Sequence, residues 1–290
     1  MKPAEASWIA GAASDYERGE IVHWPGWRGL IGWDVFLNNL CAGTLVATAL
    51  LVWVGGANAL AAPGLSLALA LLIADLLVLI ADLGDPWRFH HMLRVVRPAS
   101  PMSVGVWSLS GMGVLLGLAF VAAWLPWSAA QAMARYVMLL ACIPALGVLV
   151  YKGVLFSCTS QPGLRDARWL SAHLASSGLL LGVAALGLLT GLLDSPARTG
   201  LRVMMLVLLI PAGVSLWKLA SELAPRARER YSAGQRRALA LIVVGLGGIV
   251  PALQLGFVPG PRSIEGAAVL LLAGGWVLRQ VVIRLAEPLQ

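Results

Sequence analysis

Residues 65–84 read LSLALALLIADLLVLIADLG, an apolar run whose only charged side chains are Asp75 and Asp82. About 20 apolar residues suffice for a helix to cross the hydrocarbon core of a bilayer. A second apolar run, VGVWSLSGMGVLLGLAFVAAWL (104–125), follows a segment dense in charged, aromatic and Pro residues. This order predicts two membrane-spanning helices with polar chemistry held at the membrane surface between them. Because an acid inside a spanning helix is costly, Asp75 is also a candidate functional residue.

The composition extends this interpretation to the whole chain. Hydrophobic residues make up 59% of the 290 residues, charged residues only 12%, and the mean hydropathy is +0.82. That leaves too little polar surface to cover a soluble globule of this size. The apolar runs are also much longer than the roughly 10-residue alternating segments of a membrane β-barrel strand. We therefore expect an all-α integral membrane protein.

Eight transmembrane helices are expected between about residues 31 and 285, with four plus four of them forming two four-helix bundles in a single membrane domain over 1–290. Residues 1–30 have no apolar core, so we interpret them as a juxtamembrane arm rather than a cleaved signal peptide. The segment 221–236 is expected to be a loop. The expected spans are 31–56, 65–83, 103–125, 132–156, 169–192, 201–220, 237–257 and 264–285.

The basic residues predict the orientation of these spans. An even number of spans places both termini on one face, and that face receives 17 of the 21 Lys and Arg residues, all but Arg135, Arg198, Arg202 and Arg262. The positive-inside rule makes this face cytoplasmic. The net charge of +7 is accordingly explained by topology rather than by binding of nucleic acid.

Cysteine and histidine are too few and too scattered for a metal centre. The three cysteines are widely separated, and of the four histidines only His173 falls within an expected span. A haem of the cytochrome b type would need pairs of intramembrane histidines, and a cluster would need closely spaced cysteines. We expect no haem, iron–sulfur cluster or metal site in this chain, so any electron transfer would require metal centres in a partner.

Polar residues inside the expected spans converge on one face of the membrane. With each helix traced in its direction, five of them fall toward the basic face and Asp75 lies deeper. Amide, phenol, imidazole and carboxylate groups around a half-buried cavity are suited to hydrogen-bonding carbonyl oxygens and exchanging protons. The five are Asn39, Asp82, Tyr151, Lys152 and His173.

Each of these residues also has a purely structural interpretation. Asn39 can act as interhelical glue, and Tyr151 can belong to the interfacial aromatic belt. Lys152 is interpreted as snorkelling to the interface. Asp82 can pair with Arg88 at the start of the following loop.

Four sequence blocks carry a family resemblance. DLGDPWRFHHMLR (82–94) with SPMSVGVW (100–107) resembles the signature of the NrfD/polysulfide-reductase membrane-subunit family. Three later blocks look like further family blocks in the expected order: YKGVLFSCTSQP (151–162), WLSAHLASSG (169–178) and GGWVLRQVV (274–282). The resemblance implies an eight-helix membrane anchor that reacts with quinone, either menaquinone or ubiquinone, in the bacterial cytoplasmic (inner) membrane.

The resemblance also implies partners and site residues. The partners are a ferredoxin-like four-cluster iron–sulfur subunit and a catalytic subunit of molybdenum or tungsten type. Asn39 and Tyr151 look like quinone-contacting positions, and Asp75 or Asp82 like the acid tied to proton movement. Several relatives dock their soluble subunits outside the membrane, whereas the charge bias here places the matching face inside.

We therefore expect a quinone-linked subunit of a multi-subunit respiratory oxidoreductase that is not catalytic alone. Asn39, Tyr151 and His173 would bind quinone, and Asp75 and Asp82 would transfer protons. Two alternatives are a proton-coupled secondary transporter built on the two aspartates and a membrane anchor without a working quinone site. Five basic residues near the polar cluster are expected to dock the iron–sulfur partner: Arg88, Arg94, Arg97, Arg165 and Arg168.

Overall fold

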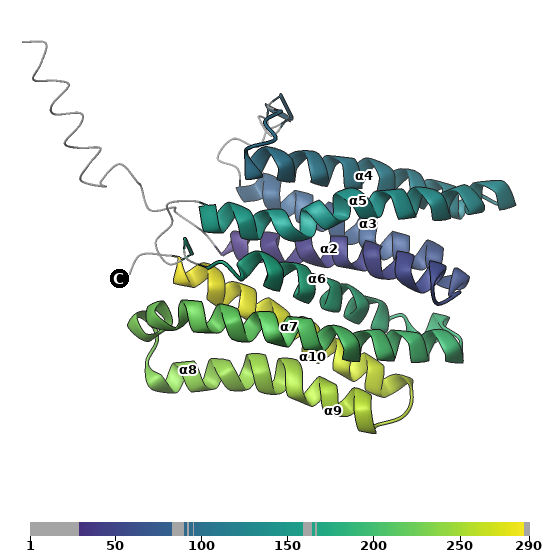
Figure 1. Cartoon of the computed structure of the whole chain (residues 1–290). Helices are drawn as coiled ribbons and strands as arrows, with labels where there is room; N and C mark the ends of the chain where they lie inside the picture. The colour runs from purple at the N-terminus through teal and green to yellow at the C-terminus, as the bar shows by residue number, and fades with distance from the viewer. Residues whose placement is uncertain are drawn as a thin grey trace, which may run out of the picture.

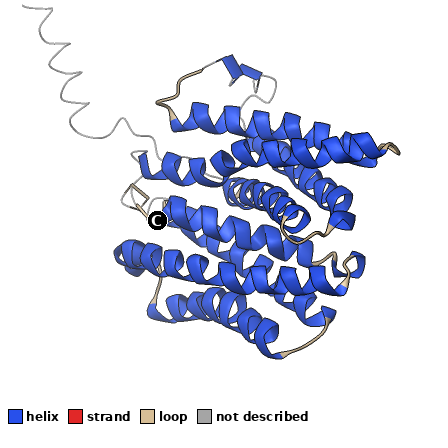
Figure 2. Cartoon of the chain, turned by 45° about the vertical axis from the view of Figure 1, so that its right-hand side comes forward, coloured by secondary structure: helices blue, strands red, loops and turns tan. Residues whose placement is uncertain are grey.

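A computed structural model describes residues 29–82, 90–91, 93–94, 96–158, 164–165 and 167–286. Within these residues the chain is helical and contains no β-strand (Figure 2). The first four long helices are α2 (Leu30–Trp53), α3 (Ala61–Asp82), α4 (Pro101–Trp124) and α5 (Ser128–Cys158). They are followed by α6 (Leu170–Gly187), α7 (Ser195–Arg230), α8 (Ala233–Ala240), the π-helix η4 (Leu241–Ile249), α9 (Val250–Phe257) and α10 (Pro261–Leu285). Short 3-10 turns, η1 (Asn58–Leu60) and η3 (Thr190–Leu192), lie in two of the connections.

Eight helical segments in the described residues are long and apolar enough to cross a membrane, with α8, η4 and α9 together forming the seventh. Large apolar side chains on their outer faces remain exposed, for example Leu77 at 63%, Ile143 at 68% and Ile210 at 67%. An apolar surface of this extent is incompatible with water and is the surface that lipid covers. The expected eight spans are confirmed, and the chain is a multi-pass membrane protein.

By their contacts the eight spanning segments of the described residues group into two four-helix bundles, which can be followed in Figure 1. Helices α2 to α5 pack against one another in the first bundle, and α6, α7, the α8–η4–α9 segment and α10 in the second. Contacts of α2 with α6 and α10, and of α5 with α6, join the two bundles. The central helices are α2 and α6, because 89% and 72% of their spanning windows are buried.

Glycines allow α2 and α6 to approach until their backbones touch. A Cβ atom added to Gly43 would meet the Gly178 carbonyl oxygen, and one added to Gly182 would meet the Gly43 carbonyl. Gly178 and Gly182 form a G-x-x-x-G pair, which brings helix axes together where no hydrophobic effect drives association within lipid. This contact fixes how the two bundles meet, and Asn39 lies one turn from Gly43 on the same side of α2.

The segment 221–236 is not the loop that the sequence predicted. Helix α7 continues to Arg230 with Pro225 inside it, and the chain then turns at Tyr231 and Ser232. Ser232 and Gln235 form a reciprocal capping box that starts α8. The prediction was wrong because it took the loss of apolar residues as the end of the helix. Outside the hydrocarbon core a helix needs no apolar face toward lipid, so a charged helical end is stable there.

The juxtamembrane arm expected over 1–30 lies almost entirely outside the described residues, since the description begins at residue 29. Arg88 also lies outside them. Helix α2 begins at Leu30, one residue before the expected start of the first span. The start of α2 and the end of α10 lie on the same side of the molecule, as an even number of spans requires (Figure 1).

Candidate functional site

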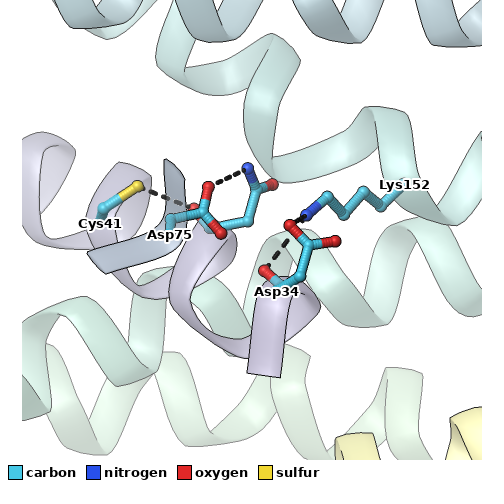
Figure 3. Close-up of polar contacts among 5 residues, drawn as sticks. Asp34, Cys41, Asp75 and Lys152 are labelled. Carbon is cyan, nitrogen blue, oxygen red and sulfur yellow. Dashed lines mark hydrogen bonds and ion pairs between the residues drawn. The ribbon is translucent and has the colours of Figure 1, made fainter. Parts of the chain in front are cut away.

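A buried ion pair between α2 and α5 lies in the first bundle, near the terminal face, where α2 begins and α10 ends. Lys152 Nζ lies 2.6 Å from Asp34 Oδ1 and donates a hydrogen bond to the Asp34 carbonyl oxygen at 3.1 Å. Lys152 is 3% exposed and Asp34 8% exposed. The interpretation of Lys152 as a snorkelling residue was therefore wrong. Its ammonium is held inside the bundle because Asp34 lies at the same depth on the adjacent helix (Figure 3).

A second polar contact extends this group toward α3. Asn38, one turn beyond Asp34 on the same face of α2, donates from Nδ2 to Asp75 Oδ2 at 3.0 Å. Asn38 and Asp75 are both fully buried, and one oxygen of each, Oδ1, has no hydrogen-bond partner among the residues that the structure describes. Cys41, a further turn along the same face, donates from Sγ to the Asn38 carbonyl at 3.2 Å. We refer to Asp34, Asn38, Asp75, Tyr151 and Lys152 as the first-bundle polar cluster (Figure 3 labels Asp34, Asp75 and Lys152, together with Cys41).

Asn39 faces the junction of the two bundles rather than the first-bundle polar cluster. Its Nδ2 donates to the backbone carbonyls of Leu149 in α5 at 3.1 Å and of Leu174 in α6 at 3.4 Å. Its Oδ1 is buried without a partner. The structural alternative for Asn39, interhelical glue, is therefore confirmed, and its carboxamide oxygen is still available to accept a hydrogen bond.

Tyr151 lies inside the first bundle, where it is 8% exposed and packs with Cys41 and Met112 in one apolar cluster. Its ring occupies the space above Gly105 of α4, since a Cβ atom added there would collide with the ring. Lys152 Nζ lies 5.7 Å from the ring centroid. A belt tyrosine would lie at the lipid interface, so that alternative for Tyr151 was wrong.

His173 belongs to a different polar group, which lies in the second bundle. Its Nδ1 lies 3.2 Å from Ser215 Oγ of α7, and its Nε2 is buried without a hydrogen-bond partner. Nearby, Arg279 of α10 donates from Nη2 to Ser177 Oγ of α6 at 3.2 Å. His173, Ser177 and Arg279 line one cavity. Tyr151 and His173 therefore contact different neighbours, α4 and α7, and the cavity beside His173 is not lined by Tyr151.

The remaining predicted residues lie toward the terminal face. Asp82 is the exposed last residue of α3, two turns beyond the buried Asp75. Arg94, Arg97, Arg165 and Arg168 are exposed around the connections that precede α4 and α6. The pairing of Asp82 with Arg88 cannot be placed, because Arg88 lies outside the described residues.

Two site residues were missed from the sequence. Asp34 was passed over although it is the only acid in the first span and lies one turn before Asn38 on the same face. Arg279 was counted only as a basic residue of the terminal face. A charged residue within an apolar span was the available signal for both.

The fold and these buried charges define a class: an all-helical, multi-pass membrane protein whose two bundles each enclose ionisable side chains. The model of the polysulphide reductase, NrfD family matches residues 26–285, nearly the whole chain. The chain belongs to this family, whose members are membrane subunits of respiratory oxidoreductase complexes. A search of curated proteins finds no match to the chain.

Proposed function

We propose that this chain exchanges electrons between a membrane quinone and an iron–sulfur partner subunit, through a quinone site beside the first-bundle polar cluster. The observation that carries this proposal is the cluster itself, in which acids from α2 and α3 meet a lysine and a tyrosine from α5 within an apolar bundle. Buried charges in a membrane are costly and are typical of proton relays and substrate pathways.

The residues present carry the hydrogen-bonding groups that a quinone headgroup would need, which supports the proposal. Quinone redox chemistry couples electron transfer to proton uptake or release at ring oxygens, so its site needs hydrogen-bonding groups linked to a proton source. Tyr151 supplies a hydroxyl that can donate a hydrogen bond. Asn39 supplies an unpartnered Oδ1 that can accept one from the hydroxyl of a hydroquinone. In this proposal the Asn39 amide nitrogen donates to the carbonyls of Leu149 and Leu174 and so holds α5 and α6, while its amide oxygen accepts a hydrogen bond from the ligand.

The cluster also supplies groups that can hold and pass a proton. Lys152 lies next to the Tyr151 ring and is paired with Asp34. Asn38 follows on the same face of α2 and links the pair to Asp75, deeper in the bundle. Asp82, the last residue of α3, lies on the same helix as Asp75 and reaches the exposed terminal face. We propose that Asp75 and Asp82, with Asp34 and Lys152, form the proton route to the ring site.

The exposed arginines are proposed to bind the partner subunit. The iron–sulfur partner would be of the ferredoxin-like four-cluster type and would dock on the terminal face near Arg94, Arg97, Arg165 and Arg168, with Arg88. Its catalytic partner would be of molybdenum or tungsten type, the membrane a bacterial cytoplasmic membrane, and the quinone menaquinone or ubiquinone. Short polar loops on a rigid scaffold commonly carry binding residues, which supports this surface.

The test compares Tyr151→Phe with Asp75→Asn in the assembled complex. Each variant keeps the shape of its side chain and removes one hydroxyl or one charge. We expect quinone-linked turnover to fall roughly ten- to a hundredfold in Tyr151→Phe, the equivalent of losing a buried hydrogen bond of about 1–3 kcal/mol. It should also fall in Asp75→Asn, because an amide cannot take up and release the proton that a carboxyl group can. Partner activity with a soluble dye should stay normal.

Tyr136→Phe is the matched control, because Tyr136 is a 65% exposed tyrosine of the same helix, close to the opposite face. Wild-type quinone turnover in both Tyr151→Phe and Asp75→Asn would reject the proposed site. Loss of assembled complex without loss of turnover per complex would instead favour a membrane anchor without a quinone site. Solute counterflow in liposomes that contain only this chain would favour the transporter alternative.

A further inference from the structure

The second bundle encloses a cavity that the proposed quinone site does not use. It has a volume of about 310 Å³ and lies between α6, α7, the π-helix η4 and α10. Aliphatic side chains and glycines form almost all of its wall, and the polar side chains in that wall are His173, Ser177 and Arg279. An apolar pocket with a few convergent polar groups is the usual form of a small-molecule site.

Arg279 is a buried cation that no carboxylate pairs within the described residues. Its side chain is held by Ser177 Oγ at 3.2 Å, by its own helix at the Gly275 carbonyl at 3.1 Å, and by the face of the Phe36 ring at 5.8 Å. The residue is 2% exposed, and its Nε has no acceptor. A buried guanidinium without an anion or a full set of acceptors is strongly unfavourable. A ligand oxygen that accepts from the guanidinium would lower the part of that cost that comes from unsatisfied donors.

The direction of the Arg279 side chain limits the chemistry of the ligand. Arginines near helix ends in membranes usually extend toward the interface, but this one reaches back to Gly275, further from the end of α10. Gly275 lies near the middle of α10, and Ser177 near the middle of α6. The guanidinium is therefore placed at mid-membrane depth, whereas lipid phosphates lie at the interface, outside a hydrocarbon core of about 30 Å.

His173 supplies a second polar group to the same cavity. Ser215 Oγ engages its Nδ1, while the buried Nε2 has no partner. Arg279 and His173 thus each present an unsatisfied nitrogen in an otherwise apolar wall. This pattern suits an uncharged ring that carries oxygen acceptors and an apolar tail. The depth of the guanidinium, rather than the number of its donors, argues against a phosphodiester.

We propose that this cavity is a second amphiphile site, which binds an uncharged ring bearing carbonyl oxygens, with Arg279 and His173 as its hydrogen-bonding residues. The identification of that ring as a quinone rests on the proposed function. Two exposed apolar residues of η4, Val244 and Ile249, line the cavity, so an apolar tail can extend into lipid.

The π-helix shapes the wall of this cavity. Gly247 of η4 packs directly on Gly274 of α10, because a Cβ atom added to Gly274 would lie 2.5 Å from the Gly247 Cα atom. The wider turn of a π-helix is rare and is frequently found at functional sites. On the opposite wall Gly213 of α7 has open space, since a Cβ atom there meets nothing within 4 Å. Gly213 is therefore the position from which a new side chain can fill the cavity without a backbone clash.

The experiment uses the full chain in liposomes, photolabelled with an azide-bearing short-chain ubiquinone, with ubiquinone-1 as competitor. We expect label on peptides of α6 and α10. Gly213→Phe and Arg279→Gln should raise the ubiquinone-1 concentration that halves this label at least about tenfold. Gly117→Phe is the matched control, because Gly117 of α4 also has open space and lies in the other bundle.

The outcomes separate this site from the proposed function. The second site is supported by label on α6 and α10 that persists in Tyr151→Phe, and that in Gly213→Phe is weaker and takes at least about tenfold more ubiquinone-1 to halve. The proposed second site is overturned if the wild type takes no label on α6 and α10, or if Gly213→Phe leaves that label unchanged. The Gly213→Phe result decides the question even if Arg279→Gln does not fold. A phospholipid retained by the wild type in native mass spectrometry and lost from Arg279→Gln also overturns it, since the cavity would then hold lipid. Normal quinone turnover in Tyr151→Phe and Asp75→Asn with this label intact rejects only the site in the first bundle.

Discussion

Replacing Lys152 by Met should destabilise the protein far more than the loss of one surface charge. Met is close in length, so the main change is that the Asp34 carboxylate loses the ammonium 2.6 Å away. The two side chains are 4% and 12% exposed, so little water is available to replace the lost partner. Removing one member of a buried pair costs about 3–5 kcal/mol, against about 0–1 kcal/mol for an exposed pair. We expect a loss of about 3 kcal/mol, at the low end because Asp34 retains some access to water.

The measurement is reversible unfolding by sodium dodecyl sulfate in mixed micelles, followed by far-ultraviolet circular dichroism. The double variant Asp34→Asn, Lys152→Met should recover a coupling energy on the order of 1–3 kcal/mol, because it strands no charge. Lys218→Met is the control, since the Lys218 ammonium lies over the Trp217 ring at 4.8 Å near the end of α7. A loss below about 1 kcal/mol in Lys152→Met, or a double variant as unstable as the sum of the single ones, would refute the buried pair.

Three further predictions concern packing, docking and topology. Gly43→Ala should destabilise the chain by about 1–3 kcal/mol, because its methyl group meets the α6 backbone, whereas Gly117→Ala, with open space, should be neutral or slightly stabilising in the same unfolding assay. Charge reversal at Arg94 and Arg97 should reduce copurification of the iron–sulfur partner at least severalfold, and unchanged copurification by a folded variant would exclude this surface. An alkaline-phosphatase fusion after Gln290 should be inactive, because the positive-inside rule makes that end cytoplasmic; an active fusion would reverse the orientation.

The number and type of helices could be read from the sequence because the bilayer imposes a length on every apolar segment. The ends of the helices were harder to predict from the sequence. Helix α7 runs ten residues past its expected end at 220, since charged residues such as Arg226 and Arg228 fit a helix outside the membrane as well as they fit a loop. Arg226 there donates to the Leu285 carbonyl at 3.3 Å, a contact with α10 that the sequence gives no means of predicting.

The site was predicted in composition but not in arrangement. The direction of each helix could be traced from the sequence, so Asp82 and Tyr151 could be expected toward one side of the membrane with Asp75 deeper. Helical periodicity also assigns residues to faces of their own helix. Periodicity does not say which faces meet. Tyr151 faces α4 and His173 faces α7, although both were expected around one cavity. Lys152 was misread for the same reason, since only the packing of α2 against α5 brings Asp34 within reach of its ammonium.

The central helix α2 connects the two polar groups. Asp34 contacts Lys152 on the side of the first bundle, whereas Phe36, two residues later and so on a different face of the helix, carries the Arg279 guanidinium over its ring. Asn39, between these sides, holds α5 and α6 by their backbone carbonyls. A rotation of α2 about its axis would therefore disturb the ion pair in one bundle and the cation–π contact in the other together. The touching backbones at Gly43 and Gly182 oppose such a rotation. Their close contact therefore holds the ion pair of the first bundle and the cation–π contact of the second bundle in place at the same time.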